Sequence, residues 1–495
     1  MNASELLAPL LWVIAAAPGG ACTQDPPAGT TPEAPPAPPS IVLDGAFDEW
    51  PEGVLATADD EWLSLRLSGD PATTLQGGQV SAALWIDVDG RAQSGRKEGD
   101  LGVDLEILFS PPSDRRPGPR AGIEIRAVGE HAIHEVVSHA AIGLAFAPTF
   151  ASESYELRIA RRTSLKEPVG SRWHRSEHVR GKFVRRDAGG AIVAEQPFDL
   201  ELERAAPPAD PAGRIPPRIE GAVRVMSWNI ERAAPRENPK PFARVLAALD
   251  PDVVLLQEWW ETSEKELLAW FSANAPSRTP WRAITFGELG CAVLTRLPAV
   301  PLLAAPLDPL RRVDDRDPRP VRFVGATVET AAGPLICGSL HLKARGHAGS
   351  WEDRLRVVEA ETIRARLASA LEATPDAALV VAGDWNLVGS DRPLDALRRA
   401  LDRDGSDLEP IDANVLGDRS LHTWTHAESS FTPGRLDWIV TSDSVLETRQ
   451  AFVLDTARLA DDALRAGRLK RDDSRATDHL PLVVDLAEKG TGGGS

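Results

Sequence analysis

Cysteine, methionine and tyrosine are all scarce in this sequence. The 495 residues include three cysteines, two methionines and a single tyrosine. The cysteines, Cys22, Cys291 and Cys337, are too few for the disulfide framework that stabilises many small secreted domains. Cys291 and Cys337 lie in apolar runs. We therefore expect them to be buried thiols, and neither a disulfide nor a nucleophile.

Positive charge is also in short supply. The chain has 55 lysines and arginines against 73 aspartates and glutamates, which gives a formal net charge of -18 at pH 7. This balance argues against a broad electropositive face for nucleic acid, although a local basic cleft is compatible with it. At about 150 residues per domain, the length predicts two or three domains with a sizeable interior.

The N-terminal segment has an apolar run, residues 6–17, that matches a secretory signal and is too short to span a bilayer as a helix. We therefore predict that residues 1–22 are an export signal. Residues 19–22, Gly-Gly-Ala-Cys, resemble a bacterial lipobox, in which Cys22 would carry a lipid anchor. Gly19 stands where leucine is usual and no Lys or Arg precedes the run, so a plain signal peptide cleaved near Ala21 is the alternative. The predicted location is the cell envelope, as a lipoprotein, or the exterior.

Composition divides the rest of the chain into segments. Residues 23–40 are rich in Pro, Ala and Thr and predict a disordered tether. Short alternating or apolar runs fill residues 41–203, which is the spacing of an all-β sandwich. A proline-rich linker is predicted at 204–220, an α/β domain at 221–487 and a flexible tail at 488–495.

Three stretches of the first domain, LDGAFDEWP, WIDVDG and GVDLEILF, resemble the carbohydrate-binding-module family 9-like β-sandwiches over about residues 40–205. The resemblance implies a glycan ligand, with Trp50 and Trp85 stacking on a sugar and Asp87 and Asp89 binding calcium. The alternatives are structural, because a strand tryptophan is usually part of the core and an Asp-x-Asp-Gly at a strand end is usually a turn.

The second half of the chain repeatedly places a catalytic type of polar residue beside an apolar run. In LVVAGDWN, residues 379–386, Gly383 allows a sharp turn, so that Asp384 and Asn386 leave the predicted strand together. The carboxylate can hold a metal or orient water, and the amide can donate to a phosphate oxygen. The corresponding residues of the other runs are Asn229 (VRVMSWNI, 223–230), Glu258 (DVVLLQE, 252–258), His341 (PLICGSLHLK, 334–343), Asp437 (RLDWIV, 435–440) and Asp478 with His479 (TDHLPLVVDL, 477–486).

The order WNI, LLQE, SLHLK, GDWN, RLDWIV and TDHLPL resembles the endonuclease/exonuclease/phosphatase superfamily over about residues 221–487. The resemblance implies a two-sheet α/β sandwich of DNase I-like type. The predicted fold class is therefore α/β, with an N-terminal all-β sandwich followed by that two-sheet domain.

The same resemblance implies a role for each residue. It makes Glu258 the principal magnesium ligand and Asp478 an acidic residue close to that metal. The implied catalytic residues are Asn229 and Asn386, which steer the phosphate; Asp384, which orients or deprotonates water; His479, which faces the phosphate and is held by Asp437; and His341, which contacts a phosphate oxygen or protonates the leaving group.

Elementary chemistry agrees with these roles. A metal ion and several donors would neutralise charge that grows on the phosphoryl oxygens during attack. An imidazole exchanges protons near neutral pH, and a carboxylate on its far nitrogen fixes the tautomer. Ligation by oxygen alone favours Mg²⁺, with Mn²⁺ as a substitute. Each site residue also has a structural alternative; Asp437, for instance, could simply pair with Arg435.

These observations predict an exported, magnesium-dependent phosphoesterase that hydrolyses a phosphate ester by in-line attack of water, most simply a nuclease-like hydrolase. A sphingomyelinase-like enzyme acting on lipid or sugar phosphodiesters is one alternative. A glycan-binding surface protein with an inactive second domain is another. The substrate would then be a phosphate ester such as nucleic acid or phospholipid. A glycan would bind the N-terminal domain, and membrane attachment would come only through Cys22. A basic loop, Lys343 to Arg354, either grips a substrate phosphate or is a solvated surface.

Overall fold

The computed structural model describes residues 40–115, 117–129, 134–204, 210–316 and 319–490. The predicted export signal at 1–22, nearly all of the tether at 23–40, part of the linker and most of the tail lie outside these ranges. Among the helices of the described ranges, none combines the length and apolarity needed to cross a membrane.

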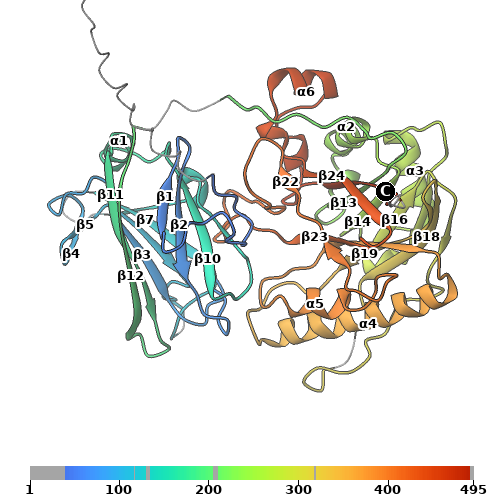
Figure 1. The fold of residues 1–495 in the computed structure, drawn as a ribbon, viewed down its shortest axis with the longest axis horizontal. Helices are drawn as coiled ribbons and strands as arrows, with labels where there is room; N and C mark the ends of the chain where they lie inside the picture. Colours follow the sequence, from blue (N-terminus) through green and yellow to red (C-terminus); the bar gives the residue numbers. More distant parts are fainter. Residues whose placement is uncertain (1–39, 116, 130–133, 205–209, 317–318, 491–495) are drawn as a thin grey trace, which may run out of the picture. The chain divides into compact units, whose positions relative to one another are not determined.

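An antiparallel β-sandwich forms the first part of the chain (Figure 1). One sheet has the order β1-β2-β10-β9: Ala56–Ala58, Trp62–Ser68, Ser154–Ala160 and Ala145–Ala147. The other has the order β12-β11-β3-β6-β7-β8: Ile192–Glu201, His178–Arg186, Ala82–Asp87, Leu105–Phe109, Ile123–Val128 and His134–Val137. Apolar residues of both sheets, such as Leu65, Leu84 and Leu157, form the core between them. The hairpin β4–β5 (Arg96–Glu98, Leu101–Val103) and helix α1 (Val169–His174) complete this part.

The two tryptophans that the glycan prediction named are core residues. Trp50 and Trp85 are each 6% exposed. The indole N–H of Trp50 donates to Glu156, and that of Trp85 donates to Glu106. Trp85 packs against apolar residues of the β4–β5 hairpin. Neither ring therefore offers a free face on which a sugar could stack, and the structural alternative holds for both.

Two mixed sheets packed face to face form the second part. The first has the order β15-β16-β14-β13-β25-β24-β22: Arg282–Thr285, Ala292–Thr295, Val253–Gln257, Val223–Asn229, Leu482–Glu488, Leu446–Val453 and Asn414–Val415. The second has the order β17-β18-β19-β20-β23-β21: Ala299–Pro301, Phe323–Thr330, Gly333–His341, Ala378–Asp384, Asp437–Thr441 and Glu409–Pro410. This is the two-sheet α/β sandwich that the sequence predicts.

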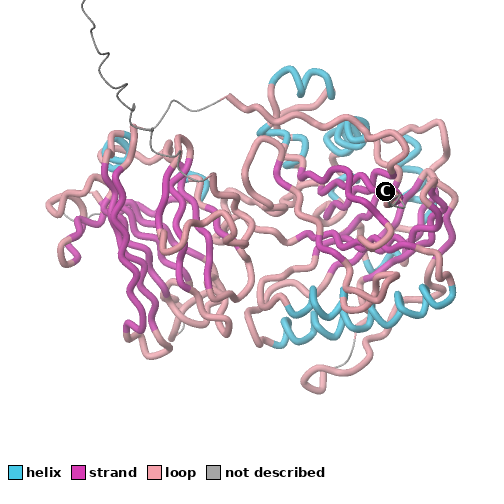
Figure 2. The backbone as a smooth tube through the Cα atoms, in the orientation of Figure 1, coloured by secondary structure: helices cyan, strands magenta, loops and turns pink. Residues whose placement is uncertain are grey.

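Helices cover the outer face of each sheet (Figures 1 and 2). Helices α2 (Pro239–Leu249), α3 (Glu264–Asn274) and α6 (Asp461–Gly467) pack on the first sheet, and α4 (Trp351–Ala373) and α5 (Arg392–Arg398) pack on the second. Because both faces are covered, strand β13 is buried throughout. Val225 points into the core between the sheets, whereas Met226 and Trp228 contact the helix layer.

The sandwich and the two-sheet part belong to one compact unit, Pro38–Ser495. A buried ion pair links them: the guanidinium of Arg158 on β10 donates to both oxygens of Asp418, at 2.8 and 2.7 Å. These side chains are 6% and 2% exposed, and the guanidinium lies 4.0 Å above the ring of Trp62. Burial alone would raise the pKa of Asp418, but the charge of Arg158 holds it well below its ordinary value.

We expect Arg158→Met to lower the free energy of unfolding by about 3 kcal/mol, because Asp418 would stay buried without its bidentate partner. Urea denaturation measures the change. Lys182→Met is the matched control, since the pair of Lys182 with Glu195 is solvent-exposed and contributes less than about 1 kcal/mol. Equal losses in the two variants would contradict a structural role for the buried pair.

Candidate active site

Strand register brings the predicted polar residues to one edge of the two sheets. Strands β13 and β14 are parallel and pair Asn229 with Gln257, so Glu258 follows at the same edge. Strands β19 and β20 are also parallel and pair His341 with Asp384. Strand β23 runs antiparallel to β20, so its first residue, Asp437, lies opposite Asp384. Parallel strands thus contribute their last residues to this edge, and antiparallel strands contribute their first.

Glu258 stands where the chain leaves β14. Its φ of 64° lies in the left-handed region, which is uncommon for a residue with a side chain and is typical of functional sites. One carboxylate oxygen is 3.4 Å from the amide nitrogen of Asn229, and the other accepts the backbone N–H of Arg232 at 3.0 Å. The side chain is 22% exposed, so a ligand can reach a carboxylate that the protein holds from two sides.

Asn229 joins the two sheets at this edge. Its amide nitrogen also donates to Asp384, at 3.1 Å, across the gap between β13 and β20. The other Asp384 oxygen accepts the backbone N–H of Asn386 at 3.0 Å. Burial, with the nearby charges of Asp437 and Glu258, raises the pKa of Asp384 against the opposing effect of His479.

His479 and Asp437 form a buried pair. The Nδ1 of His479 lies 2.7 Å from an oxygen of Asp437, which fixes the ring and leaves Nε2 to face the site. That Nε2 is 3.8 Å from Asp384 and 4.0 Å from Asp478. Burial alone would lower the pKa of His479, but the adjacent Asp437 raises it well above its ordinary value. The imidazolium is therefore the favoured form at neutral pH.

Asp478 and His341 complete the group. The indole N–H of Trp424 donates to Asp478 at 2.9 Å and orients its carboxylate. The Nε2 of His341 is 3.4 Å from Asp384 and 3.9 Å from Glu258. Burial, reinforced by the charge of Arg322, lowers the pKa of His341 well below its ordinary value. A neutral ring at this position suits a hydrogen bond to a phosphate oxygen better than the donation of a proton.

All eight predicted residues thus lie in one contiguous network. Its members are Asn229, Glu258, His341, Asp384, Asn386, Asp437, Asp478 and His479. The network contains oxygen donors for a hard cation, amides for a phosphate and one positively charged imidazole. This is the set of groups that hydrolysis of a phosphate ester requires. The individual roles remain predictions.

Two residues that the sequence did not single out also contact the network. The guanidinium of Arg322 is 3.1 Å from Nδ1 of His341, and the ring of Trp260 lies 6.1 Å from the imidazole. Arg322 directly precedes β18, which runs antiparallel to β19, and its carbonyl accepts the backbone N–H of His341. Arg322 could therefore have been found from its position at the start of an antiparallel strand, which is also the position of Asp437.

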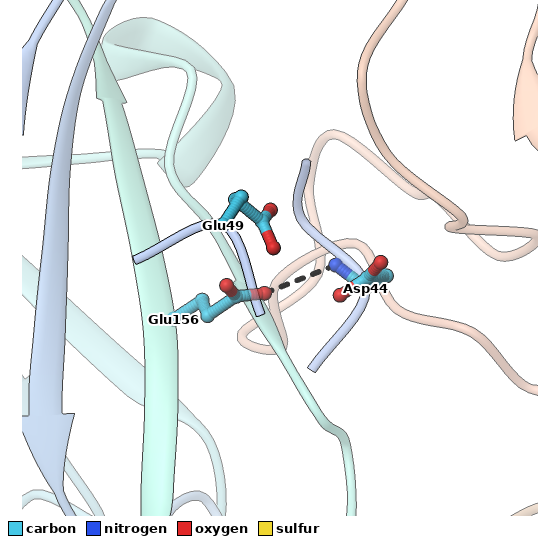
Figure 3. A group of neighbouring side chains, drawn as sticks. All are labelled: Asp44, Glu49 and Glu156. Carbon is cyan, nitrogen blue, oxygen red and sulfur yellow. Dashed lines mark hydrogen bonds between the residues drawn. The ribbon is translucent and has the colours of Figure 1, made fainter. Parts of the chain in front are cut away.

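Two further acidic groups in the described part of the chain lie in the β-sandwich. Asp44, Glu49 and Glu156 form the first (Figure 3). Glu156 accepts N–H groups from Asp44, Gly45 and Trp50 at 3.1, 2.8 and 2.7 Å, and burial raises its pKa to about 7. These bonds hold the turn that begins at Asp44 against β10.

The second acidic group, Asp87, Asp89 and Asp104, contains both residues of the calcium prediction. Arg180 donates to Asp87 at 3.1 Å, and Arg172 pairs with Asp104. The two guanidinium groups offset part of the negative charge, but burial and the charge of Asp89 still raise the pKa of Asp104 to about 7. Calcium binding by Asp87 and Asp89 stays a prediction.

A comparison with protein families covers the part of the chain that holds this site. A family model described as "Endonuclease/Exonuclease/phosphatase family" matches residues 226–479, just over half of the chain and a range that includes all eight residues. No curated protein matches the sequence.

Several solved structures resemble the chain at low sequence identity. The human Nocturnin catalytic domain with bound sulfate is 20% identical, with a TM-score of 0.37, and the match covers 55% of this chain and 96% of that one. An endonuclease/exonuclease/phosphatase family protein from Bacteroides thetaiotaomicron is 18% identical, with a TM-score of 0.35, and the match covers 54% of this chain and 97% of that one. Sphingomyelinase C from Streptomyces griseocarneus is 14% identical, with a TM-score of 0.33, and the match covers 53% of this chain and 99% of that one.

We expect Asp437→Asn to shift the alkaline limb of the pH profile of kcat/KM to lower pH. The raised pKa of His479 depends on the Asp437 charge, so the imidazolium form would be lost at lower pH in the variant. Asp412→Asn removes a carboxylate that is 69% exposed and paired with Arg435, and it serves as the control. An unchanged alkaline limb in Asp437→Asn would show that this pair does not set the protonation of the catalytic group.

Proposed function

Because the chain belongs to the endonuclease/exonuclease/phosphatase family and is a phosphoric ester hydrolase, we propose that it cleaves its ester by in-line attack of water with the help of a divalent cation, Mg²⁺ in preference. The observation that carries this proposal is the continuous path of contacts from Glu258 through Asn229 and Asp384 to His479. Residues from both sheets meet there, at the end of strands that fix their positions.

The cation would bind Glu258 and Asp478. Both carboxylates are partly exposed at 22% and 23%, and both are oriented by an N–H donor, which fits a hard cation with open coordination positions. Bound there, the cation would neutralise charge on the phosphate. Side chains of the protein supply the other groups that act on the water and the phosphate.

In the proposed mechanism, Asp384 orients the attacking water and accepts its proton, for which its raised pKa is suitable. The imidazolium of His479 donates through Nε2 to a phosphoryl oxygen, while Asp437 holds the ring. As the water oxygen bonds to phosphorus, the ester P–O bond breaks, and the leaving oxygen takes up a proton from solvent. Asn229 holds Asp384 through its side-chain amide, and Asn386 holds it through its backbone N–H. We assign both side-chain amides the role of donors to the bound phosphate. His341, on the neighbouring strand β19, lies beside Asp384.

For the substrate we propose a nuclease-like activity, with lipid or sugar phosphodiesters as the second candidate. The complete polar network argues against an inactive domain that serves glycan binding. We further propose that the protein is exported and that Cys22 carries a lipid anchor, a proposal that rests on residues 1–22 of the sequence alone.

Glu258→Gln, Asp384→Asn and His479→Gln should each lower kcat for bis(p-nitrophenyl) phosphate by about 100- to 10,000-fold, because each removes a charge or proton carrier that acts in the transition state. Circular dichroism checks that the fold is kept, and Glu264→Gln on the exposed face of α3 is the control.

The same assay tests the cation. Treatment with EDTA should abolish hydrolysis, and Mg²⁺ or Mn²⁺ should restore it. Wild-type rates in all three folded variants would refute the site, and full activity in EDTA would refute the metal.

Salt dependence separates the candidate substrates. Ca²⁺ and Mg²⁺ are removed to prevent cleavage. If the protein contacts about three phosphates of single-stranded DNA, the DNA should bind roughly tenfold to twentyfold more weakly at about 200 mM than at about 50 mM salt. We expect this loss of DNA affinity if the protein is a nuclease. Binding that is absent or insensitive to salt, together with hydrolysis of a sphingolipid or sugar phosphodiester, would overturn the nuclease proposal.

A further inference from the structure

A cavity of about 880 Å³ opens beside the catalytic network, on the His341 side. Residues within 309–316 and 319–322 form one wall, and the first turns of α4 with Lys343 form another. Arg322 and Trp260 line this cavity and also contact His341. The cavity and the proposed phosphate site therefore share a boundary.

The lining is strongly cationic. Five arginines and one lysine line the cavity, against the two carboxylates Glu288 and Glu359. The carboxylate of Glu359 accepts the backbone N–H of Lys343 at 2.8 Å, and burial raises the pKa of Glu359. Such a concentration of positive charge is unusual in a chain with a net charge of -18. Among the basic residues of the loop 343–354, Lys343 lines the cavity.

Tryptophans hold two of the arginines in place. The guanidinium of Arg316 lies 4.2 Å above the ring of Trp351, and that of Arg322 lies 5.8 Å from the ring of Trp260. The Trp351 ring is itself fixed by a hydrogen bond from its indole N–H to the carbonyl of Val313, at 3.2 Å. Stacking leaves the edge of the Arg316 guanidinium available to donate, and that edge matches the geometry of a phosphate. Arg322 already donates to the carbonyl of Leu342 and contacts His341.

We propose that this cavity binds a second phosphate group of the substrate, joined to the scissile phosphate by a short organic spacer. The inference rests on the proposed function, because it places the scissile phosphate between His341 and His479. Arg322 stands at the boundary between the two phosphates, and Arg316 and Arg319 line the cationic cavity. A nucleic-acid strand and a small molecule with several phosphates share this chemistry.

The direct test compares two chromogenic substrates that differ by one phosphate: thymidine 3′-(p-nitrophenyl phosphate) with and without a 5′-phosphate. The wild-type enzyme should show a kcat/KM about tenfold or more higher for the form with the 5′-phosphate, since a charged hydrogen bond to an arginine contributes that much. The double variant Arg316→Gln/Arg319→Gln should lose this preference and keep its rate on bis(p-nitrophenyl) phosphate.

Arg278→Gln/Arg282→Gln is the control matched in charge, because both arginines are exposed and lie outside the cavity lining. It should keep the preference. Equal kcat/KM for the two thymidine esters in the wild-type enzyme, or the same preference in both double variants, would overturn the proposal.

A binding assay separates this inference from the proposed function. Fluorescein-labelled oligothymidylate is titrated with protein in EDTA, and inositol hexakisphosphate competes. Binding of either compound that is lost in Arg316→Gln/Arg319→Gln supports the second phosphate site, and the compound that binds identifies its source. Binding with no hydrolysis of any ester would refute the proposed function alone. Binding of neither compound would refute the cavity as a phosphate site.

Discussion

The register of strand β20 is the constraint on which the site depends. One residue of this strand, Asp384, pairs with His341 on the parallel side and with Asp437 on the antiparallel side. The same residue reaches Asn229 across the core, in the other sheet. A slip of one residue would turn Asp384 away from this edge and exchange the two faces of a strand that is buried on both. The apolar layers on either side therefore fix the catalytic geometry as firmly as they fix the fold.

The site gathers charges that a stable core would avoid. Three carboxylates, Asp384, Asp437 and Asp478, lie within 4.0 Å of the ring of His479. Buried like charges destabilise a fold unless cations offset them, and here the imidazolium offsets part of the negative charge. The remaining negative charge is what a hard cation would neutralise, and the cation and the imidazolium together would attract the phosphate. Stability and function thus make opposite demands on the same few residues.

The sequence predicts the second domain well because its signals are local. Each apolar run is long enough to identify a strand, and the polar residue beside it, such as Asn229 or His341, can be read directly. The cationic cavity could not be read in this way, because Arg316 and Trp351 come from a loop without periodicity and from a helix, and only the fold brings them together. For the same reason the resemblance of three short motifs in the first domain implied glycan contacts at Trp50 and Trp85, whereas packing buries both.

The most direct measurement of the central claim is the position of a bound metal and an ester analogue in a crystal. Anomalous scattering from Mn²⁺, soaked together with a non-hydrolysable phosphorothioate, would locate both groups. We expect the ion on the carboxylate of Glu258, with the phosphorothioate between His341 and His479. Manganese bound only at the acidic groups of the β-sandwich, with the edge beyond β20 empty, would contradict it.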